Sequence, residues 1–188
     1  MKLSSFSSRD FDRGAPRAKE AAWIVLSGMF FESWFPGSAW RKWLLRAFGA
    51  TIGERVTIKP RVRVKFPWRL SVKSDVWIGE GVWIDNLETV LIGSDVCISQ
   101  GAYLCTGSHD WEKTTFDLIV KPIHISSHAW IGAMARLAPG TRVGRGAIVG
   151  MGAVVSGELA PYHVFANRKE GMLTISRRRM VSSSGERV

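Results

Sequence analysis

Aliphatic residues recur at every sixth position through much of the chain, with one interruption between Leu104 and Ile125. The series consists of Ile92, Ile98, Leu104, Ile125, Ile131, Leu137, Val143, Val149 and Val155. A small or β-branched residue stands two positions before each of them, and none of these positions is charged. A period of six matches neither the 3.6-residue period of a helix nor the alternation of a hairpin strand. We therefore expect short strands that turn a corner every six residues.

This period is typical of a parallel β-helix, in which three short strands and three corners form one coil of about 18 residues. Glycine follows several of the aliphatic residues, where a corner benefits from the absence of a Cβ atom. The period begins upstream at Ile52. The spacing widens to eight between Leu70 and Ile78, and again between Ile84 and Ile92. Each widening predicts a two-residue bulge at a corner.

The interruption predicts a loop that leaves the coil. Leu104 and Ile125 are separated by 21 residues where whole hexads would need 18, and the stretch after Asp110 contains no hexad. We expect an excursion loop over residues 110–121, with His109 at its base. Loops displayed on a rigid scaffold often carry binding and catalytic groups.

The repeats resemble those of the hexapeptide-repeat acyltransferases, as in residues 131–136 (IGAMAR) and 143–148 (VGRGAI). Residues 83–86 (WIDN), 100–110 (QGAYLCTGSHD) and 121–123 (KPI) are similar to the colanic-acid or exopolysaccharide acetyltransferase branch of that family. The resemblance covers roughly residues 40–166. It implies an all-β, left-handed parallel β-helix that forms a homotrimer with active sites between subunits. The implied reaction moves an acetyl group from acetyl-CoA to a sugar hydroxyl.

Acyl transfer to an alcohol needs a base, and histidine suits that role near neutral pH. The resemblance assigns it to His109 of the TGSH motif. The base needs an acceptor on its other ring nitrogen. The family uses a carboxylate at this point of the loop, for which Asp117 is the nearest match and Asp110 competes. The resemblance also makes the backbone N–H of Ala133 the donor to the oxyanion.

The remaining site residues are implied by the resemblance alone. The contacts to acetyl-CoA fall on Trp130, Gly132, Ala133, Met151 and Ser156, with Arg168 or Lys169 for the phosphates. Trp130 has outward packing as an alternative role. The acceptor residues are Asp85 and Asn86, although an Asn side chain can instead stabilise a corner. The family ends its last coil with Gly-Asn-Pro-Ala, whereas residues 166–169 here read ANRK, which leaves the path of the exit segment open.

Composition limits the kinds of partner that the protein is expected to bind. The chain has 188 residues, a formal net charge of +10 and a pI near 10.2, so anionic partners are favoured. No basic run is interleaved with aromatic residues, which argues against nucleic acid. The two cysteines set no disulfide framework and suit a cytoplasmic location, with peripheral contact at the inner face of the membrane as an option.

The chain divides into three regions. Residues 1–49 form an N-terminal arm and an amphipathic helical cap, and residues 50–160 form the β-helix. Residues 161–188 form an exit segment and a basic tail that we expect to be solvated and disordered from Gly171 onward. The apolar stretch 21–31 is too short to span a bilayer. Residues 34–48 form a tryptophan-rich, basic amphipathic helix that either caps the β-helix or makes, with the whole segment 21–48, peripheral contact with a membrane.

Three other functions stay open at this stage. A zinc hydratase with this architecture would use His109, His124 and His128 as ligands. A non-catalytic scaffold would use the β-helix only to trimerise. A ping-pong transferase would carry the acetyl group on Cys105. Acetyl transfer by direct attack is the prediction, with no metal.

Overall fold

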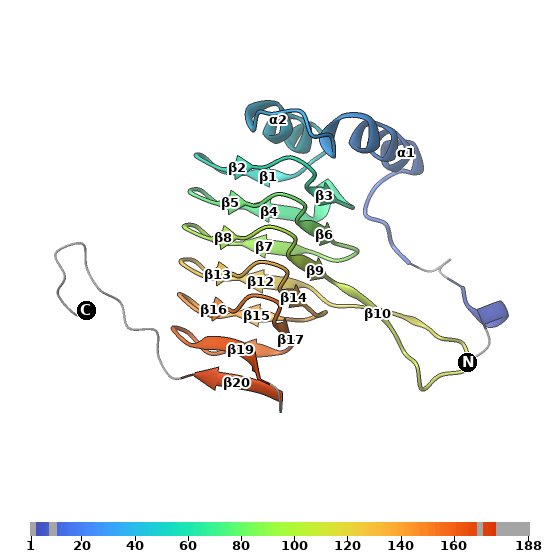
Figure 1. The fold of residues 1–188 in the computed structure, drawn as a ribbon. Coiled ribbons are helices and arrows are strands. Elements are labelled where there is room, and N and C mark those ends of the chain that lie inside the picture. The colour runs from blue at the N-terminus through green and yellow to red at the C-terminus, as the bar shows by residue number, and fades with distance from the viewer. Residues whose placement is uncertain (1–2, 8–10, 169–170, 176–188) are drawn as a thin grey trace.

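The computed structural model describes residues 3–7, 11–168 and 171–175, and its strands stack into the three walls of a β-helix (Figure 1). The first wall contains β1 (Thr51–Ile52), β4 (Leu70–Val72), β7 (Val90–Ile92), β12 (Ile123–Ile125), β15 (Arg142–Val143) and β18 (Glu158–Leu159). The second contains β2 (Thr57–Ile58), β5 (Trp77–Ile78), β8 (Cys97–Ile98), β13 (Trp130–Ile131), β16 (Ile148–Val149) and β19 (Val164–Arg168). The third contains β3 (Arg63–Val64), β6 (Trp83–Asp85), β9 (Tyr103–Cys105), β14 (Arg136–Leu137) and β17 (Val154–Val155).

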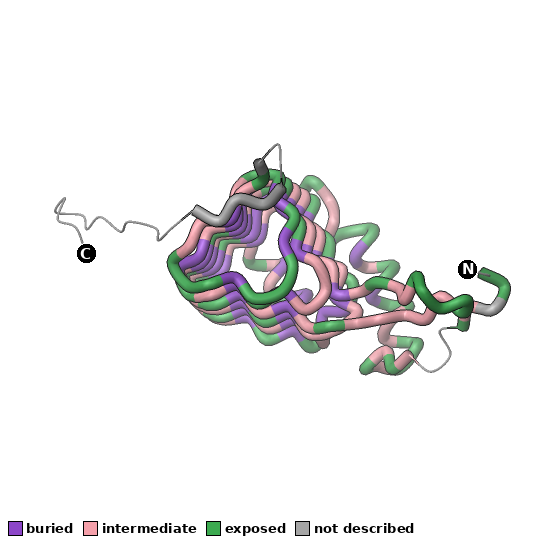
Figure 2. The backbone as a smooth tube through the Cα atoms, turned by 90° about the horizontal axis from the view of Figure 1, so that it is seen from below, coloured by how far each residue is buried: buried purple, intermediate pink, exposed green. Residues whose placement is uncertain are grey.

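Parallel pairing stacks the aliphatic residues of successive coils directly above one another. In the third wall, Val64 pairs with Ile84, Ile84 with Leu104, Leu104 with Leu137 and Leu137 with Val155. All of these side chains point inward and are buried, so the core is a continuous column inside the ring of backbone (Figure 2). Each such side chain contributes about 1.5–3 kcal/mol to folding. The prediction of a parallel β-helix is confirmed.

Extra residues gather at one corner, where the third wall meets the first. A 3-10 helix, η3 (Pro67–Arg69), fills it after β3, residues 86–89 fill it after β6, and a hairpin leaves it after β9. Ile52 pairs with Val72, so the extra residues of the first coil, which include η3, come before β4. The bulge predicted after Leu70 is therefore wrong, because Leu70 and Val72 both point inward and Val72 is the residue that continues the ladder.

Three helical elements cover the first coil: α1 (Arg17–Leu26), the π-helix η2 (Ser27–Phe31) and α2 (Ala39–Ala47). A short 3-10 helix, η1 (Leu3–Ser5), precedes them. The open edges of β1, β2 and β3 would expose backbone groups, and side chains of the helices bond to each. Arg46 Nη2 donates to the carbonyl of Ile52 at 2.7 Å, Ser38 Oγ accepts from the Ile58 N–H at 2.8 Å, and Trp23 Nε1 donates to the carbonyl of Val64 at 2.8 Å.

The other end of the solenoid is closed by an antiparallel pair. β19 pairs along its length with β20 (Gly171–Ile175). The prediction of a disordered tail is therefore wrong for residues 171–175, which form a strand that continues the second wall. Of the helices in the described ranges, none is long and apolar enough to cross a membrane.

Candidate active site

His109 lies on the first strand of the hairpin formed by β10 (Gly107–His109) and β11 (Leu118–Val120). Its Nδ1 atom is 2.9 Å from the backbone carbonyl oxygen of Phe116. A carbonyl oxygen only accepts hydrogen bonds, so Nδ1 carries the proton in the neutral ring. The lone pair is then on Nε2, which is the form that a general base requires.

Two aromatic rings hold the imidazole in place. The ring of Phe116 is parallel to it, with an interplanar angle of 2° and centroids 4.2 Å apart. The ring of Phe6, from the N-terminal arm, meets it edge-on at 5.2 Å. Phe116 adopts a left-handed backbone conformation with φ of 52°, which is uncommon for a bulky residue and is typical of constrained functional loops.

Neither predicted carboxylate is the partner of His109 Nδ1 in the structure. The carboxylate of Asp117 accepts a hydrogen bond from Lys113 Nζ at 3.0 Å, and that of Asp110 accepts from the Glu112 N–H at 3.1 Å. Hydrogen bonds from Thr115 and Lys113 lower the pKa of Asp117. The prediction for Asp117 fails because the hairpin turn directs the carbonyl of the preceding residue, not the Asp117 side chain, toward the imidazole.

A polar cavity of about 540 Å³ lies beside the hairpin, between the N-terminal arm and the corner where the third wall meets the first. Leu118, the cross-strand partner of His109, is one of its lining residues. The cavity is lined by Ser7, Phe11, Asp12, Arg69, Glu88, Asp117, Leu118 and Val120. Carboxylates and a guanidinium together offer acceptors and donors for hydroxyl groups.

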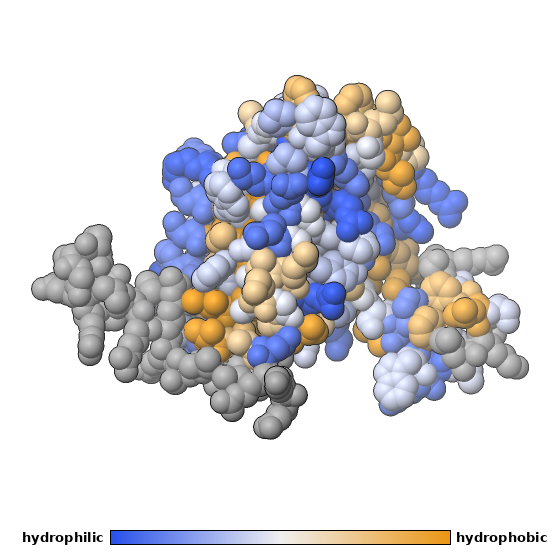
Figure 3. Space-filling view, viewed as in Figure 1, coloured by the Kyte–Doolittle hydropathy of each residue, from blue (hydrophilic) through white to orange (hydrophobic). Residues whose placement is uncertain are grey.

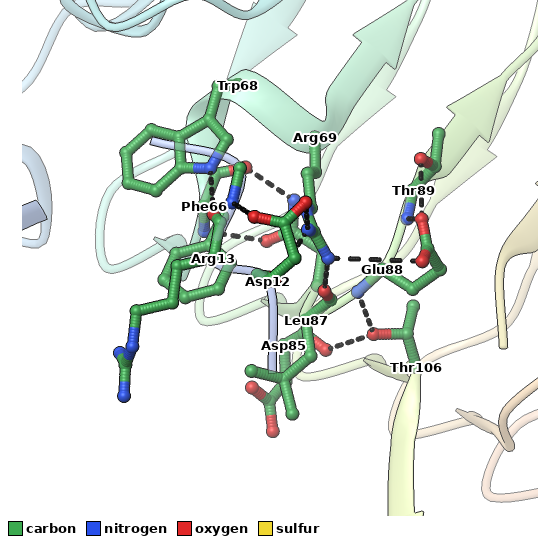
Figure 4. A network of polar contacts seen from close by, with 12 residues as sticks. Asp12, Arg13, Phe66, Trp68, Arg69, Asp85, Leu87, Glu88, Thr89 and Thr106 are labelled. Carbon is green, nitrogen blue, oxygen red and sulfur yellow. Dashed lines mark hydrogen bonds and ion pairs between the residues drawn. The ribbon is translucent and has the colours of Figure 1, made fainter. Parts of the chain in front are cut away.

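Arg69 holds this cavity together, as Figure 4 shows. Its guanidinium lies between the arm and the neighbouring corner, donating to the backbone carbonyls of Asp12, at 2.6 Å, and Leu87. It also forms ion pairs with the carboxylates of Asp12 and Glu88 at 3.7 and 3.9 Å. The indole of the adjacent Trp68 donates to the carbonyl of Arg13 at 2.7 Å. The corner thereby docks the arm against the site.

Glu88 is held in its charged form at the cavity wall. Its Oε1 atom accepts from the backbone N–H of Thr89 at 2.7 Å and from the Thr89 hydroxyl at 2.9 Å. The backbone hydrogen bond is the main reason that the pKa of Glu88 is lowered. The buried Thr106 hydroxyl accepts from the Glu88 N–H at 2.9 Å and donates to the Asp85 carbonyl at 3.0 Å, which ties this corner to the coil below it.

Asn86 does not face the cavity. Its side chain is fully buried, and its amide accepts from the Phe66 N–H at 3.0 Å and donates to the Phe66 carbonyl at 2.7 Å. The prediction that Asn86 grips an acceptor is wrong, because both polar atoms are consumed in joining two stacked corners. The alternative role that we weighed, stabilisation of a corner, is the one observed.

Asp85 is a structural neighbour of the site. Its carboxylate accepts from the Tyr103 hydroxyl at 3.0 Å and forms an ion pair with Lys65 at 3.2 Å. These residues come from three successive coils of the third wall. Burial, together with the hydrogen bonds to Cys105 and Asp85, raises the pKa of Tyr103. The Cys105 thiol itself donates to the carbonyl of Gly107 at 3.0 Å.

Most residues predicted to contact acetyl-CoA lie at or beside a different corner, between the second and third walls, whereas Ser156 follows β17 at the corner between the third and first walls. The Trp130 side chain on β13 points outward and is half exposed, and its indole N–H donates to Ser99 Oγ at 2.9 Å. Ala133 follows in the corner between the second and third walls. Among the described residues, no backbone acceptor is found for the Ala133 N–H. Met151 and Ser156 are exposed on later coils.

Gly132 has a packing role that the family resemblance did not reveal. A Cβ atom there would lie 2.7 Å from the backbone nitrogen of Met151 in the next coil. The side chain of Arg168 and the whole of Lys169, both predicted to meet phosphates, lie outside the described residues.

The three histidines of a zinc hydratase are not brought together. His109 is on the hairpin, and His124 Nδ1 is 3.0 Å from Arg142 Nη1 on the first wall. His128 occupies a corner with φ of 64° and lies 3.7 Å from Asp95. Within the described ranges, no three His, Cys, Asp or Glu side chains form a group that could hold a metal ion.

The sequence did not reveal the contribution of Asp12, Arg69 and Glu88 to the cavity. A usable signal was present, since the irregular stretches near residues 65–69 and 86–89 precede the excursion loop by two coils and by one coil, respectively. Stacking these stretches would have placed Arg69 and Glu88 at one corner, whereas Asp12, in the N-terminal arm, carries no such signal.

Comparison with known proteins relates the chain to a group of acetyltransferases. No family model matches the chain. It is 38% identical over 148 residues to WcaF of Escherichia coli K12, which is assigned to colanic acid biosynthesis as an acetyltransferase; the match covers 78% of this chain and 81% of WcaF. It is 25% identical over 129 residues to the galactoside O-acetyltransferase of the same organism, covering 67% and 64% of the two chains.

A solved structure shares the fold. The hexapeptide-repeat acetyltransferase VCA0836 of Vibrio cholerae, complexed with acetyl coenzyme A, superposes with a TM-score of 0.77 at 19% identity. The superposition covers 93% of this chain and 96% of that one.

Proposed function

The chain belongs to the hexapeptide-repeat acetyltransferase family, and from this premise we propose that it transfers an acetyl group from acetyl-CoA to a sugar hydroxyl in exopolysaccharide biosynthesis. The identity with WcaF supports the pathway class. The observation that carries the chemistry is the contact between His109 Nδ1 and the Phe116 carbonyl, because it leaves Nε2 free of the proton and able to act as a base.

The proposed reaction is direct attack. Nε2 of His109 takes the proton of the acceptor hydroxyl as the oxygen attacks the thioester carbonyl carbon, whose π electrons move to oxygen. The N–H of Ala133 donates to that oxyanion. When the carbonyl re-forms, the carbon–sulfur bond breaks and the thiolate receives the proton from His109. The products are the O-acetyl sugar and CoA.

The polar cavity is the proposed acceptor site. Its carboxylates, from Asp12, Glu88 and Asp117, accept hydrogen bonds from sugar hydroxyls, and the remaining donor capacity of Arg69 serves ring or hydroxyl oxygens. Phe11 offers an aromatic face at the same cavity, over which the Arg69 guanidinium lies at 5.5 Å. A mixture of this kind suits a polar ligand with apolar faces.

The proposed site needs two subunits. His109 leaves the solenoid at the corner between the third and first walls, whereas Ala133 lies at the corner between the second and third walls. One chain therefore does not bring base and oxyanion donor together. In a cyclic homotrimer packed through its walls, the hairpin of one subunit can face the Ala133 corner of its neighbour.

The proposed cosubstrate site follows from the same arrangement. Trp130 exposes its side chain on the wall that leads to Ala133, and Met151 is exposed at the same corner in the next coil, so both would contact the pantetheine and adenosine portions. Ser156, exposed after β17 at the end of the third wall, is a further proposed contact. Arg168 and Lys169 remain proposals for the phosphates. The enzyme is proposed to be cytoplasmic, where it has access to acetyl-CoA, and to contact the membrane peripherally through residues 21–48. This location suits an acceptor that is linked to lipid.

The test is thiol release from acetyl-CoA in the presence of free, nucleotide-linked and lipid-linked sugars. His109→Ala should lower the acceptor-dependent rate by about 10²–10⁴. His163→Ala is the matched control, because His163 also places Nδ1 against a carbonyl, that of Pro161 at 2.8 Å, but in the last coil. Equal rates for wild type and His109→Ala, with an acceptor that stimulates release, would overturn the assignment.

A further inference from the structure

The helical cap, which we define as residues 17–48, presents an apolar groove of about 520 Å³ at the end of the solenoid. Its lining includes Leu26, Phe30, Phe35, Trp40, Trp43 and Phe48. Phe30, Phe35 and Trp43 are 52%, 59% and 68% exposed, and Trp34 beside them is 73% exposed. Hydrophobic residues gather over this end of the molecule in Figure 3. A contiguous exposed apolar surface of this kind marks an interaction site.

A buried arginine holds the exposed aromatic loop in shape. The Arg41 side chain is fully buried and donates to the carbonyls of Phe31, Ser33, Phe35 and Gly37, at distances from 2.6 to 3.2 Å. Burial lowers its pKa. A guanidinium is costly to bury unless its donors are satisfied, and here four loop carbonyls satisfy it. The loop that displays Trp34 and Phe35 is therefore ordered with its aromatic rings in solvent.

The groove is flanked by positive charge. Apart from the buried Arg41, the helical cap contains four Lys or Arg residues and two Glu residues. On α2, Lys42 and Arg46 lie beside Trp43 on the face away from the buried Leu44 and Leu45. Tryptophan and phenylalanine next to basic residues suit the interface of an anionic bilayer, where the rings enter the headgroup region and the cations meet lipid phosphates.

We propose that this surface of the helical cap docks on an anionic phospholipid bilayer. The proposal deepens the proposed function, because it names the lipid class and the residues that would hold the enzyme near a lipid-linked acceptor. The helices are not long enough to span the bilayer, so docking is peripheral. Phe30, Trp34, Phe35 and Trp43 insert, and Lys42 pairs with headgroups.

The position of the cap suits this role. It covers the first coil, and the His109 hairpin leaves the solenoid two coils below it. Two strand spacings of about 4.8 Å and one helical layer of about 10 Å place the hairpin roughly 20 Å from the bilayer. In the proposed trimer, subunits packed side by side direct all three caps to the same side, so three weak contacts act together.

The experiment is co-sedimentation of the full chain with vesicles of phosphatidylglycerol and phosphatidylcholine, and with phosphatidylcholine alone. We expect binding to the anionic vesicles that weakens with salt. The double variant Phe30→Ser, Trp43→Ser should bind at least tenfold more weakly, since each ring loses most of its insertion free energy. Trp111→Ser, which removes an exposed tryptophan at the tip of the hairpin, is the control and should bind as the wild type does.

The outcomes separate this proposal from the enzymatic one. Loss of vesicle binding in the double variant, with an unchanged rate on a free sugar acceptor, supports the docking surface. Failure of the wild type to bind anionic vesicles overturns it and leaves the transferase assignment standing. Concentration-dependent association beyond a trimer, lost in the double variant, would identify the occupant as a second copy and also overturn it.

Discussion

His109 Nδ1 and the backbone carbonyl of Phe116 lie 2.9 Å apart across the β10–β11 hairpin. Because the partner is a main-chain atom, the tautomer of His109, the proposed base, does not depend on a carboxylate. Asp117→Asn should therefore lower kcat by less than tenfold, whereas His109→Ala lowers it by about 10²–10⁴. Acceptor-dependent thiol release measures both.

The same pair of variants shows whether Asp117 positions the His109 ring or binds the acceptor. Asp117 lines the polar cavity, so Asp117→Asn is free to raise the KM of the acceptor. A loss of kcat as large as that of His109→Ala would contradict the main-chain assignment and restore the carboxylate as the partner of the base.

The docking of the N-terminal arm leads to the second prediction. Arg69 bonds to the carbonyl of Asp12, and Trp68 bonds to that of Arg13. Arg69→Gln should release the arm, lower kcat/KM for the acceptor about tenfold or more and leave the KM of acetyl-CoA unchanged. The free arm should also be cut by trypsin after Arg13. A charge-assisted hydrogen bond of this kind contributes about 1.5–3 kcal/mol.

Arg55→Gln is the control for this variant. Arg55 is exposed and pairs with Asp75 at 2.6 Å on a distant corner, and an exposed pair contributes little to stability. Its tryptic pattern and kinetics should match those of the wild type. An Arg69→Gln enzyme with normal acceptor kinetics would show that the arm is no part of the acceptor site.

The fold was predictable because its signal is local and repeated. Each coil buries the same kind of side chain at the same spacing along the sequence. The ladder of Ile98, Ile131 and Val149 could therefore be predicted without knowledge of long-range contacts. The placement of the first insertion was not predictable from spacing alone. Leu70 and Val72 are both aliphatic and both buried, and only pairing with Ile52 decides between them.

The site was predictable only in part, for a related reason. His109 lies in a motif at the point where the period is interrupted, so the sequence could single it out as a candidate. Arg69 and Asp12 are 57 residues apart and meet through a backbone carbonyl, a contact with no periodic signature. For Asn86, the sequence allowed either acceptor binding or stabilisation of a corner, because asparagine can fill both roles. The burial of its side chain in the structure distinguishes between them.

The buried amide of Asn86 leads to the third prediction. Asn86→Ala leaves the N–H and the carbonyl of Phe66 without partners in a buried corner, which should lower the free energy of unfolding by about 2–5 kcal/mol. Chemical denaturation measures this. Asn167→Ala, which removes an exposed amide that donates to the Gly152 carbonyl, should change stability by less than about 0.5 kcal/mol. An unchanged stability in Asn86→Ala, with a raised acceptor KM, would instead favour sugar binding.

The pKa of Tyr103 leads to the fourth prediction. Burial and the bonds to Cys105 and Asp85 raise this pKa above the ordinary value of about 10. Above that pH the unfolded chain releases the proton and the folded chain retains it. The stabilisation is thus complete below pH 10 and is lost as pH rises further. Tyr103→Phe should flatten this alkaline fall in the denaturation midpoint, whereas Tyr162→Phe, at an exposed corner, should leave it in place.

The corner that contains Ala133 permits a test of the shared site. The Ala135 N–H donates to the Gly132 carbonyl at 3.2 Å, and Met134 has φ of 58°. This is a four-residue turn with a left-handed third position, and proline is favoured at the second position of such a turn. Ala133→Pro should therefore fold while removing the proposed oxyanion donor.

Ala133→Pro and His109→Ala should each be nearly inactive alone and should complement each other in mixed trimers. A site is complete when its His109 comes from an Ala133→Pro subunit and its Ala133 comes from a His109→Ala subunit. Random assembly of equal amounts of the two variants gives about one such site in four. Co-expression followed by thiol-release assays should recover roughly a quarter of the wild-type rate. No recovery, from trimers shown by mass to contain both chains, would place base and oxyanion donor in the same subunit.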